Sequence, residues 1–376
     1  MKLLIVLMMF PQFVETIYSP ALPSIATAFE VSENKAQWTI SIYFIAFALG
    51  VVFWGIQSDY IGRRKAMIYG LLTYCIASLL PLFYSTFEVI LFARGLAAFG
   101  IAVGSVITQT IIRDVYTGKE LSKVFSIMGV ALSISPIIGL LVGGTVVKSY
   151  NHYGIFTLLA ILSFILATIT IFTLPETLQN NIPLKRQQIK ELAQQLYTDT
   201  SIWLFALLIM GFNVMLFSYY SFAPFIFKHT ELDPSIYGYS GIVLSIGTFV
   251  GSTINKYCIK KNYSPYLLIW SASLLSLSSA SFVYFTQHTL YFLLPTLFSV
   301  AAFGIAIPNI LSQSLIKYKQ QIGTAGALFG LLYYLLIGLG LLFSSELPNM
   351  GIVYLCFGTL VALLSFILYT KKRAIN

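Results

Sequence analysis

Two charged side chains inside otherwise apolar segments carry the most distinctive chemistry of this sequence. Glu15 lies about 16 Å into the first segment and Arg94 about 10 Å into the fourth, at ~1.5 Å per residue. An unpaired charge at the centre of a bilayer costs ~2.5–3.5 kcal/mol, so each side chain should face a wet cavity or the other charge. A carboxylate in such a cavity can take a proton from one side and release it to the other. The alternative is a static Glu15–Arg94 pair that only fixes a helix contact.

Further polar side chains occur near Glu15 and in the second half of the chain. The candidate substrate-binding residues are Gln12, Glu15, Thr16, Tyr18, Ser19, Asn213, Tyr219 and Tyr220. Four of the first five follow the i, i+3, i+4, i+7 spacing of one helix face, and Tyr18 lies three residues from Glu15. We expect this polar stripe to line a cavity. Asn213 and the two later tyrosines offer polar tips from the other half, although Asn213 could instead hydrogen-bond between helices.

The elements that position these groups are long apolar segments. The chain of 376 residues is 58% hydrophobic and only 9% charged. Runs without a charged residue include 36–58, 66–87, 95–112, 124–147, 149–175, 200–227, 234–255, 262–316, 320–345 and 347–370. A helix needs ~20 apolar residues to cross a bilayer, whereas barrel strands have ~10 residues of alternating polarity. The sequence therefore predicts an all-α polytopic membrane protein with twelve transmembrane helices.

The basic residues gather in alternate gaps between the apolar segments. Of the 22 Lys and Arg residues, 18 fall in one set of gaps, at 2, 63–65, 113–123, 185–190, 256–261, 317–319 and 371–373. The opposite set holds only Lys35, Lys148 and Lys228. Because basic loops stay on the cytoplasmic side, we expect both termini in the cytoplasm and a multi-pass protein of the inner membrane. The net charge of +9 could suggest that the protein binds nucleic acid. The gathering of the basic residues in the loops of one side argues against that interpretation.

A polar gap near the middle divides the chain into two halves. We predict a six-helix bundle over 1–174, a cytoplasmic loop with a short amphipathic helix over 175–200, and a second six-helix bundle over 201–376. The sequence AAFGIA occurs at 97–102 and again at 301–306, at matching positions in the two halves. Parallel six-helix repeats are typical of one large transporter class, whose substrate site lies near the bilayer midplane between the halves.

The gap between the second and third segments combines glycines with charges. Asp59 can pair with Arg63 or with a helix N-terminus, and Gly62 can take the positive φ of a tight turn. Arg113 and Asp114 lie in another gap on the same side. We predict that these residues form a gate, because ion pairs at a bundle interface can bias a rocking equilibrium. Alternatively, the arginines only fix the topology.

The fifth segment contains a proline followed by glycines. Pro136 removes a backbone hydrogen bond and can kink the helix, while Gly139 and Gly143 permit close packing against a partner helix. Bending at this motif would help to close one side of the cavity. Simple close packing is the alternative, and the two roles are compatible.

These motifs resemble those of a known transporter family. The run 55–65, with the pattern G-x-x-x-D-x-x-G-R-R-K, resembles the loop signature of the major facilitator superfamily. Stretches 18–25, 113–120, 135–144 and 219–226 are similar to its Bcr/CflA-type (bicyclomycin/chloramphenicol-resistance) subfamily of drug:proton antiporters. The resemblance implies twelve helices in two bundles and efflux of small organic compounds against inward proton flow. It implies the proton gradient as energy source and no cofactor.

The chain departs from the subfamily pattern at two places. Thr16 stands where the subfamily usually has an Asp, and the acid here is Glu15, one residue earlier and ~100° around the helix. Ala97 and Ala98 replace a Gln-Gly pair in the fourth helix. Export or import of a specific metabolite, such as a siderophore or a nutrient, therefore stays open beside drug efflux.

The residue pattern argues against a membrane-embedded enzyme. The sequence has no nucleophile–base spacing and no phosphate-cradling loop in an ATPase context. Its three cysteines and three histidines are scattered without the spacing of metal ligands. The expected partners are a small-molecule substrate, protons and membrane lipid, and the expected oligomeric state is a monomer.

Overall fold

The computed structural model describes residues 1–178 and 186–373, which fold almost entirely into helices. The first half comprises α1 (Lys2–Thr16), the 3-10 turn η1 (Ser19–Ala21), α2 (Leu22–Ala28), α3 (Glu33–Ile61), α4 (Arg63–Phe83), α5 (Phe87–Val115) and α6 (Gly118–Thr173). The second half comprises α8 (Thr200–His229), α9 (Pro234–Lys260), α10 (Pro265–Thr286), η2 (Leu290–Phe292), α11 (Leu293–Ser314), η3 (Ile316–Gln321), α12 (Ile322–Ser345) and α13 (Met350–Arg373). Between the halves lies α7 (Arg186–Thr198). The predicted all-α fold is confirmed.

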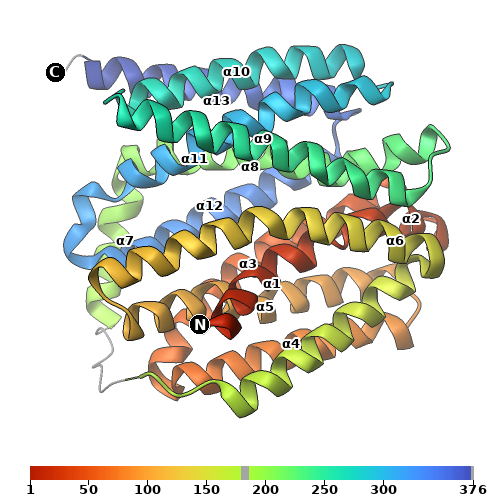
Figure 1. Cartoon of the computed structure of the whole chain (residues 1–376), viewed down its shortest axis with the longest axis horizontal. Coiled ribbons are helices and arrows are strands. Elements are labelled where there is room, and N and C mark those ends of the chain that lie inside the picture. Colours follow the sequence, from red (N-terminus) through yellow and green to blue (C-terminus); the bar gives the residue numbers. More distant parts are fainter. Residues whose placement is uncertain (179–185, 374–376) are drawn as a thin grey trace.

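Helix α6 contains two of the predicted crossings. Its 56 residues are interrupted at Asn151 (φ 52°, ψ −155°), and Figure 1 shows the helix running to one end of the molecule and returning. This combination of a positive φ with an extended ψ lies outside every helical region, so the helix is interrupted here. Eleven helical stretches of the described residues are long and apolar enough to cross a membrane. Because α6 doubles back, they give the twelve predicted crossings.

The helices form two bundles that share two long interfaces. In Figure 1, α1 to α6 occupy the lower half and α8 to α13 the upper half. The bundles meet where α3 packs on α12 and where α6 packs on α9. The predicted amphipathic helix is present as α7, which packs on α8 and α12 and buries Leu192 and Leu196. Residues 179–185 of the predicted central loop lie outside the described residues.

The two ends of the molecule differ in their loops. One end, which we call the terminal end, carries the start of α1, the end of α13, helix α7 and the connections at 62, 116–117, 174–178, 261–264 and 315–321. The other, which we call the far end, carries the connections at 29–32, 84–86, 230–233, 287–289 and 346–349, and the α6 reversal. The basic loops therefore gather at the terminal end in three dimensions, as they do in sequence.

The AAFGIA repeat makes equivalent helix contacts in the two bundles. In the first bundle Gly50 of α3 packs on the repeat in α5, and a Cβ at Gly50 would lie 2.5 Å from the carbonyl oxygen of Phe99. In the second bundle Gly251 of α9 packs on the backbone of Ala301 in α11. Small residues allow helix backbones to approach this closely. The halves thus repeat a packing contact as well as a sequence.

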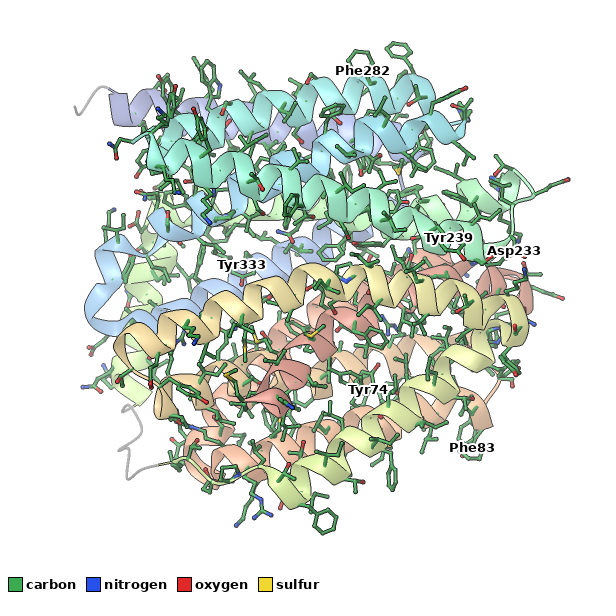
Figure 2. The ribbon with its side chains drawn as sticks, viewed as in Figure 1. Tyr74, Phe83, Asp233, Tyr239, Phe282 and Tyr333 are labelled. Carbon is green, nitrogen blue, oxygen red and sulfur yellow. The ribbon has the colours of Figure 1, made fainter. Side chains whose placement is uncertain are left out.

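Large apolar side chains cover the outer surface. Phe83 is 75% exposed and Phe282 is 65% exposed, and Figure 2 places both at the outer edges of the bundles. Lipid tails are as apolar as these side chains, so a membrane removes the cost of exposing them. The outer surface is therefore suited to lipid rather than to water.

Candidate functional site

A cavity of about 260 Å³ lies between the two bundles. It is lined by Met8, Pro11, Gln12, Glu15, Tyr43, Phe44, Phe47, Ser105, Gln109, Leu132, Asn213, Phe217 and Tyr334. These residues come from α1, α3, α5 and α6 of the first bundle and from α8 and α12 of the second. Figure 2 labels Tyr333, the neighbour of Tyr334, between the bundles. A relative movement of the bundles would therefore change the shape of this cavity.

Glu15 is the one charged side chain among the described residues that line the cavity. It is only 7% exposed, and its Oε1 has no hydrogen-bond partner among the protein atoms. A buried carboxylate without a partner is costly in its charged form, because burial removes its hydration. A proton or a positively charged group that enters the cavity would relieve that cost.

Arg94 lies beside this cavity rather than in its lining. Its guanidinium carbon is 3.8 Å from the ring centre of Tyr18 and 4.8 Å from that of Tyr43. No ion pair within 4.0 Å joins Arg94 to Glu15 in the part of the chain that the structure describes. The expectation that each charge faces a cavity or the other is thus wrong for Arg94, because a planar guanidinium can stack on aromatic faces instead. Tyr43 lines the cavity, and its ring also faces the Arg94 guanidinium. Tyr43 therefore lies between Arg94 and the cavity.

Three of the eight predicted substrate-binding residues line the cavity, namely Gln12, Glu15 and Asn213. Asn213 donates its Nδ2–H to the carbonyl oxygen of Ile209, 2.8 Å away in the same helix. Asn213 therefore uses its amide N–H within its own helix, instead of in the hydrogen bond between helices that the sequence left open. Its amide oxygen remains available to the cavity.

The predicted polar stripe is wrong beyond Glu15. Thr16 donates its hydroxyl to the carbonyl oxygen of Gln12 at 3.0 Å and packs against Gly139 of α6. Helix α1 ends at Thr16, and the 3-10 turn η1 begins at Ser19. The 3.6-residue period therefore stops before Ser19, which turns away from the cavity lining.

The three predicted tyrosines also lie outside the cavity lining. Tyr18 stacks on Arg94, and Tyr219 donates its hydroxyl to Ser240 in α9. Tyr220 packs edge-to-face on Tyr219 with ring centres 5.8 Å apart. Each tyrosine is buried within a bundle or at the junction between bundles, so its proposed contact with substrate has no geometric support in this conformation.

The structure adds lining residues that the sequence reasoning missed. Phe44 and Phe217 meet across the bundles with ring centres 4.4 Å apart, and Phe47 meets Tyr334 at 5.1 Å. Ser105 and Gln109 contribute polar groups from α5. Ser105 and Gln109 lie at i, i+4 on one face of an apolar helix, the same kind of one-face spacing that pointed to Gln12, Glu15 and Thr16. Applying that criterion to the fourth segment would have found them.

Comparison with known proteins identifies the fold. The family model described as Major Facilitator Superfamily matches residues 4–341. The chain belongs to the major facilitator superfamily. This transporter is 31% identical over 380 residues to an uncharacterized transporter of Rickettsia bellii, covering 95% of this chain and 94% of that one.

Drug-resistance proteins and a sugar symporter are also similar to this major facilitator. Multidrug resistance protein D of Escherichia coli is 23% identical over 361 residues, covering 93% of this chain and 89% of that one. A bicyclomycin resistance protein homolog of Haemophilus influenzae is 28% identical over 185 residues, covering 48% and 46%. A crystal structure of a D-xylose-proton symporter has the same fold, with a TM-score of 0.76 at 16% identity and 96% and 95% coverage. The predicted superfamily and the resemblance to Bcr/CflA-type exporters are confirmed.

Six polar contacts between the bundles of this major facilitator lie at its far end. At the centre, the hydroxyl of Ser19 donates to the carbonyl oxygen of Tyr220 at 2.5 Å and lies 2.6 Å from the hydroxyl of Tyr237. The others join Lys148 to Asp233 (2.9 Å), Lys228 to Thr27 (2.8 Å), His229 to Glu33 (3.0 Å) and Trp38 to Glu346 (3.2 Å). Figure 2 labels Asp233 where the bundles meet. The far end is therefore closed in this conformation.

The Lys148–Asp233 pair should not make far-end closure sensitive to pH between 5 and 8. Hydrogen bonds from Ser235 and from Lys148 lower the pKa of Asp233 to about 2. A group with a lowered pKa contributes its stability above its unfolded-state pKa of ~3.9 and loses it as pH falls through the folded value. The labelling rate of a cysteine introduced at the far end, divided by the rate of the same cysteine in Asp233→Asn, should stay constant over this range, because the change in thiolate fraction with pH is common to both proteins. A transition between pH 5 and 8 that disappears in Asp233→Asn would contradict this expectation.

The predicted gate residues form a network within one bundle. Arg63, 3% exposed, pairs with Asp59, lies 3.4 Å from Oδ2 of Asp114 and donates to Ser58. Arg113 is separate, with its guanidinium 5.7 Å from the ring of Phe125. The expectation of ion pairs across the bundle interface is wrong here, because every member belongs to the first half. The network instead ties α3 and α4 to α5.

Glu176, just after α6, completes this network and was missed as a site residue. Its two carboxylate oxygens accept the backbone N–H groups of Arg63 at 2.9 Å and Arg64 at 3.2 Å, at the start of α4. Gly62 has the predicted positive φ, 94°, and a Cβ there would collide with the Glu176 carboxylate. Glu176 therefore caps α4 from a distant part of the chain.

Glu176→Gln should lower the free energy of unfolding by about 1 kcal/mol at pH 7. Partial burial raises the pKa of Glu176, but hydrogen bonds from the N–H groups of Leu178, Arg63 and others outweigh it, so the net pKa is lowered. The stabilisation should therefore be present above pH ~4.3 and disappear as pH falls through the lower folded pKa. Thermal unfolding in detergent between about pH 3 and 7 would measure it. Glu191→Gln, which changes an exposed carboxylate on α7, is the control, and equal losses in both variants would reject the cap.

The proline–glycine motif of the fifth segment, which lies in α6, packs on the end of α1. A Cβ at Gly143 would collide with the carbonyl oxygen of Ile17, and Gly139 faces Thr16. The only non-helical residue within the described part of α6 is Asn151, so the backbone stays helical at Pro136. The close-packing interpretation describes this conformation, whereas bending at Pro136 remains a prediction.

Proposed function

We propose that this transporter exports small organic compounds across the inner membrane in exchange for protons. The observation that carries the proposal is Glu15, a buried carboxylate with an unpartnered oxygen, facing a cavity built by both bundles. The named drug-resistance relatives support the substrate class. The basic loops support a cytoplasmic terminal end, and one chain supplies both bundles, as a monomer requires.

Alternating access couples the two fluxes in this proposal. In the present conformation the far end is closed by the six contacts, so exchange takes place from the terminal end. Substrate entering from the cytoplasm releases the proton of Glu15 to that side. Opening of the far end then exposes Glu15 to outside protons, and protonation displaces the substrate. Arg94 lies one tyrosine ring away from the cavity, and in this proposal it holds a fixed positive charge beside the exchange site.

A second candidate is transport of a specific polar metabolite. The cavity carries three amide side chains, Gln12, Gln109 and Asn213, which suit a solute with several hydrogen-bonding groups. This alternative keeps the fold and the role of Glu15, and changes the substrate class or direction of transport.

Substrate-evoked proton release in inverted membrane vesicles tests the proposal. A proton gradient is imposed so that the vesicle interior is acidic. Vesicles with the protein should then release protons when a lipophilic drug is added outside, whereas vesicles without the protein should not. Release with siderophore-like or nutrient compounds alone would favour the second candidate. No release with either panel, although the protein binds a member of it, would reject proton exchange.

A further inference from the structure

A second and larger cavity lies on the outer surface of the first bundle, between α3 and α5. Its volume is about 630 Å³. It is lined by Lys35, Trp38, Ile42, Ala46, Phe87, Glu88, Leu91, Phe92, Gly95, Leu96 and Phe99. Phe92 is 64% exposed, so this groove opens toward the region that lipid occupies. It is distinct from the central cavity, with which it shares none of these residues.

The groove has the length of one lipid leaflet. Both helices start at the far end and run in the same direction. From Lys35 to Ala46 the groove follows α3 for about 16 Å, close to half of the ~30 Å hydrocarbon thickness. It ends where the helices touch, because Gly50 meets the backbone of Phe99 and Trp54 donates its indole N–H to the same carbonyl at 2.8 Å. A single acyl chain matches this depth.

Small residues keep the groove open above that contact. A Cβ at Gly95 would lie 3.5 Å from Ile42 and 3.8 Å from Ala46, which is ordinary van der Waals contact. A larger side chain at Gly95 would therefore be accommodated by the fold while it fills the groove.

The mouth of the groove carries two opposite charges at the far end. Lys35 lies in the first turn of α3 and Glu88 in the first turn of α5, and both are exposed. Neither forms an ion pair within 4.0 Å with any residue that the structure describes. Trp38 lines the same mouth and donates its indole N–H to Glu346, which adds a second carboxylate nearby.

We propose that this groove binds one phospholipid with a zwitterionic headgroup that contains a primary ammonium, as in phosphatidylethanolamine. One acyl chain fills the groove, the phosphate pairs with Lys35, and the ammonium donates hydrogen bonds to Glu88. An anionic headgroup without the ammonium, as in phosphatidylglycerol, would place its phosphate among two carboxylates and one lysine. The headgroup therefore determines which phospholipid is preferred, and the acyl chain in the groove contributes binding free energy for either lipid. This site does not depend on the role of Glu15.

Native mass spectrometry of the full-length protein tests this site. Protein extracted from equimolar phosphatidylethanolamine and phosphatidylglycerol vesicles should retain the former about fivefold in preference. This is the upper end expected for one exposed ion pair, ammonium to Glu88, because the phosphate of either lipid can pair with Lys35. Lys35→Gln with Glu88→Gln should reduce the preference to about one. Lys65→Gln, at the terminal end, is the matched control and should leave the preference intact.

Gly95→Leu tests the contribution of the acyl chain to binding separately from that of the headgroup. It should reduce retention of both lipids, about fivefold or more, with Lys35 and Glu88 unchanged. Equal retention of the two lipids by the wild type would overturn the proposal, as would unchanged retention in Gly95→Leu. If Gly95→Leu removed drug transport but not lipid retention, the groove would be a lateral entrance for substrate and the lipid assignment would be wrong.

Discussion

Glu15→Gln should reduce substrate-evoked proton movement by at least about 100-fold, a difference of ~2.7 kcal/mol. Glutamine keeps the shape of the side chain but removes the proton that exchanges with substrate. Because it also removes a buried charge, the thermal unfolding temperature should stay equal or rise. Proton release in inverted vesicles and thermal unfolding in detergent would measure the two effects. Glu15→Asp should keep measurable exchange, since a carboxylate remains.

Glu231→Gln is the matched control for Glu15→Gln. It makes the same chemical change in an exposed carboxylate at the far end, outside the cavity. Its proton release should equal that of the wild type. If Glu15→Gln retained full coupling, or if it lost stability together with activity, Glu15 would be a structural residue and the exchange mechanism would lose its proton carrier.

Gly144→Ala should open the far end and reduce transport by about tenfold or more. A Cβ at Gly144 of α6 would lie 2.6 Å from the carbonyl oxygen of Pro234, and one at Gly238 of α9 would lie 2.8 Å from that of Leu140. The two bundles therefore touch backbone to backbone here, beside the Lys148 contact. Overpacking at such a site costs ~1–3 kcal/mol, which the molecule can relieve by separating the bundles.

Cysteine labelling from each side of the membrane would measure that opening. A cysteine at Ser105 in the cavity, with the three native cysteines replaced by serine, should gain reactivity toward an impermeant reagent added at the far end. Gly330→Ala in α12 is the control, because its Cβ would meet no atom closer than 3.8 Å. Unchanged far-end labelling in Gly144→Ala would show that this contact does not hold the closed state.

Sequence alone was sufficient for the architecture because membrane helices obey one-dimensional rules. Each crossing needs ~20 apolar residues whatever its neighbours, so twelve crossings could be predicted before any packing was known. The loop signature from Gly55 to Lys65, together with Gly139 and Gly143 of α6, pointed to the superfamily that the comparison confirms. Glu15 was placed at a cavity because a charge in an apolar helix must find polar surroundings.

Tertiary structure decided which way each polar side chain faces. Sequence spacing assumes one continuous helix, but α1 ends at Thr16, so Ser19 joins the far-end contacts instead of the cavity. Arg94 could pair with an acid or stack on rings, and only the positions of Tyr18 and Tyr43 select stacking. The location of the closed end depends on which helices meet across the bundles. Those are contacts between residues far apart in the chain, and helix periodicity does not encode them.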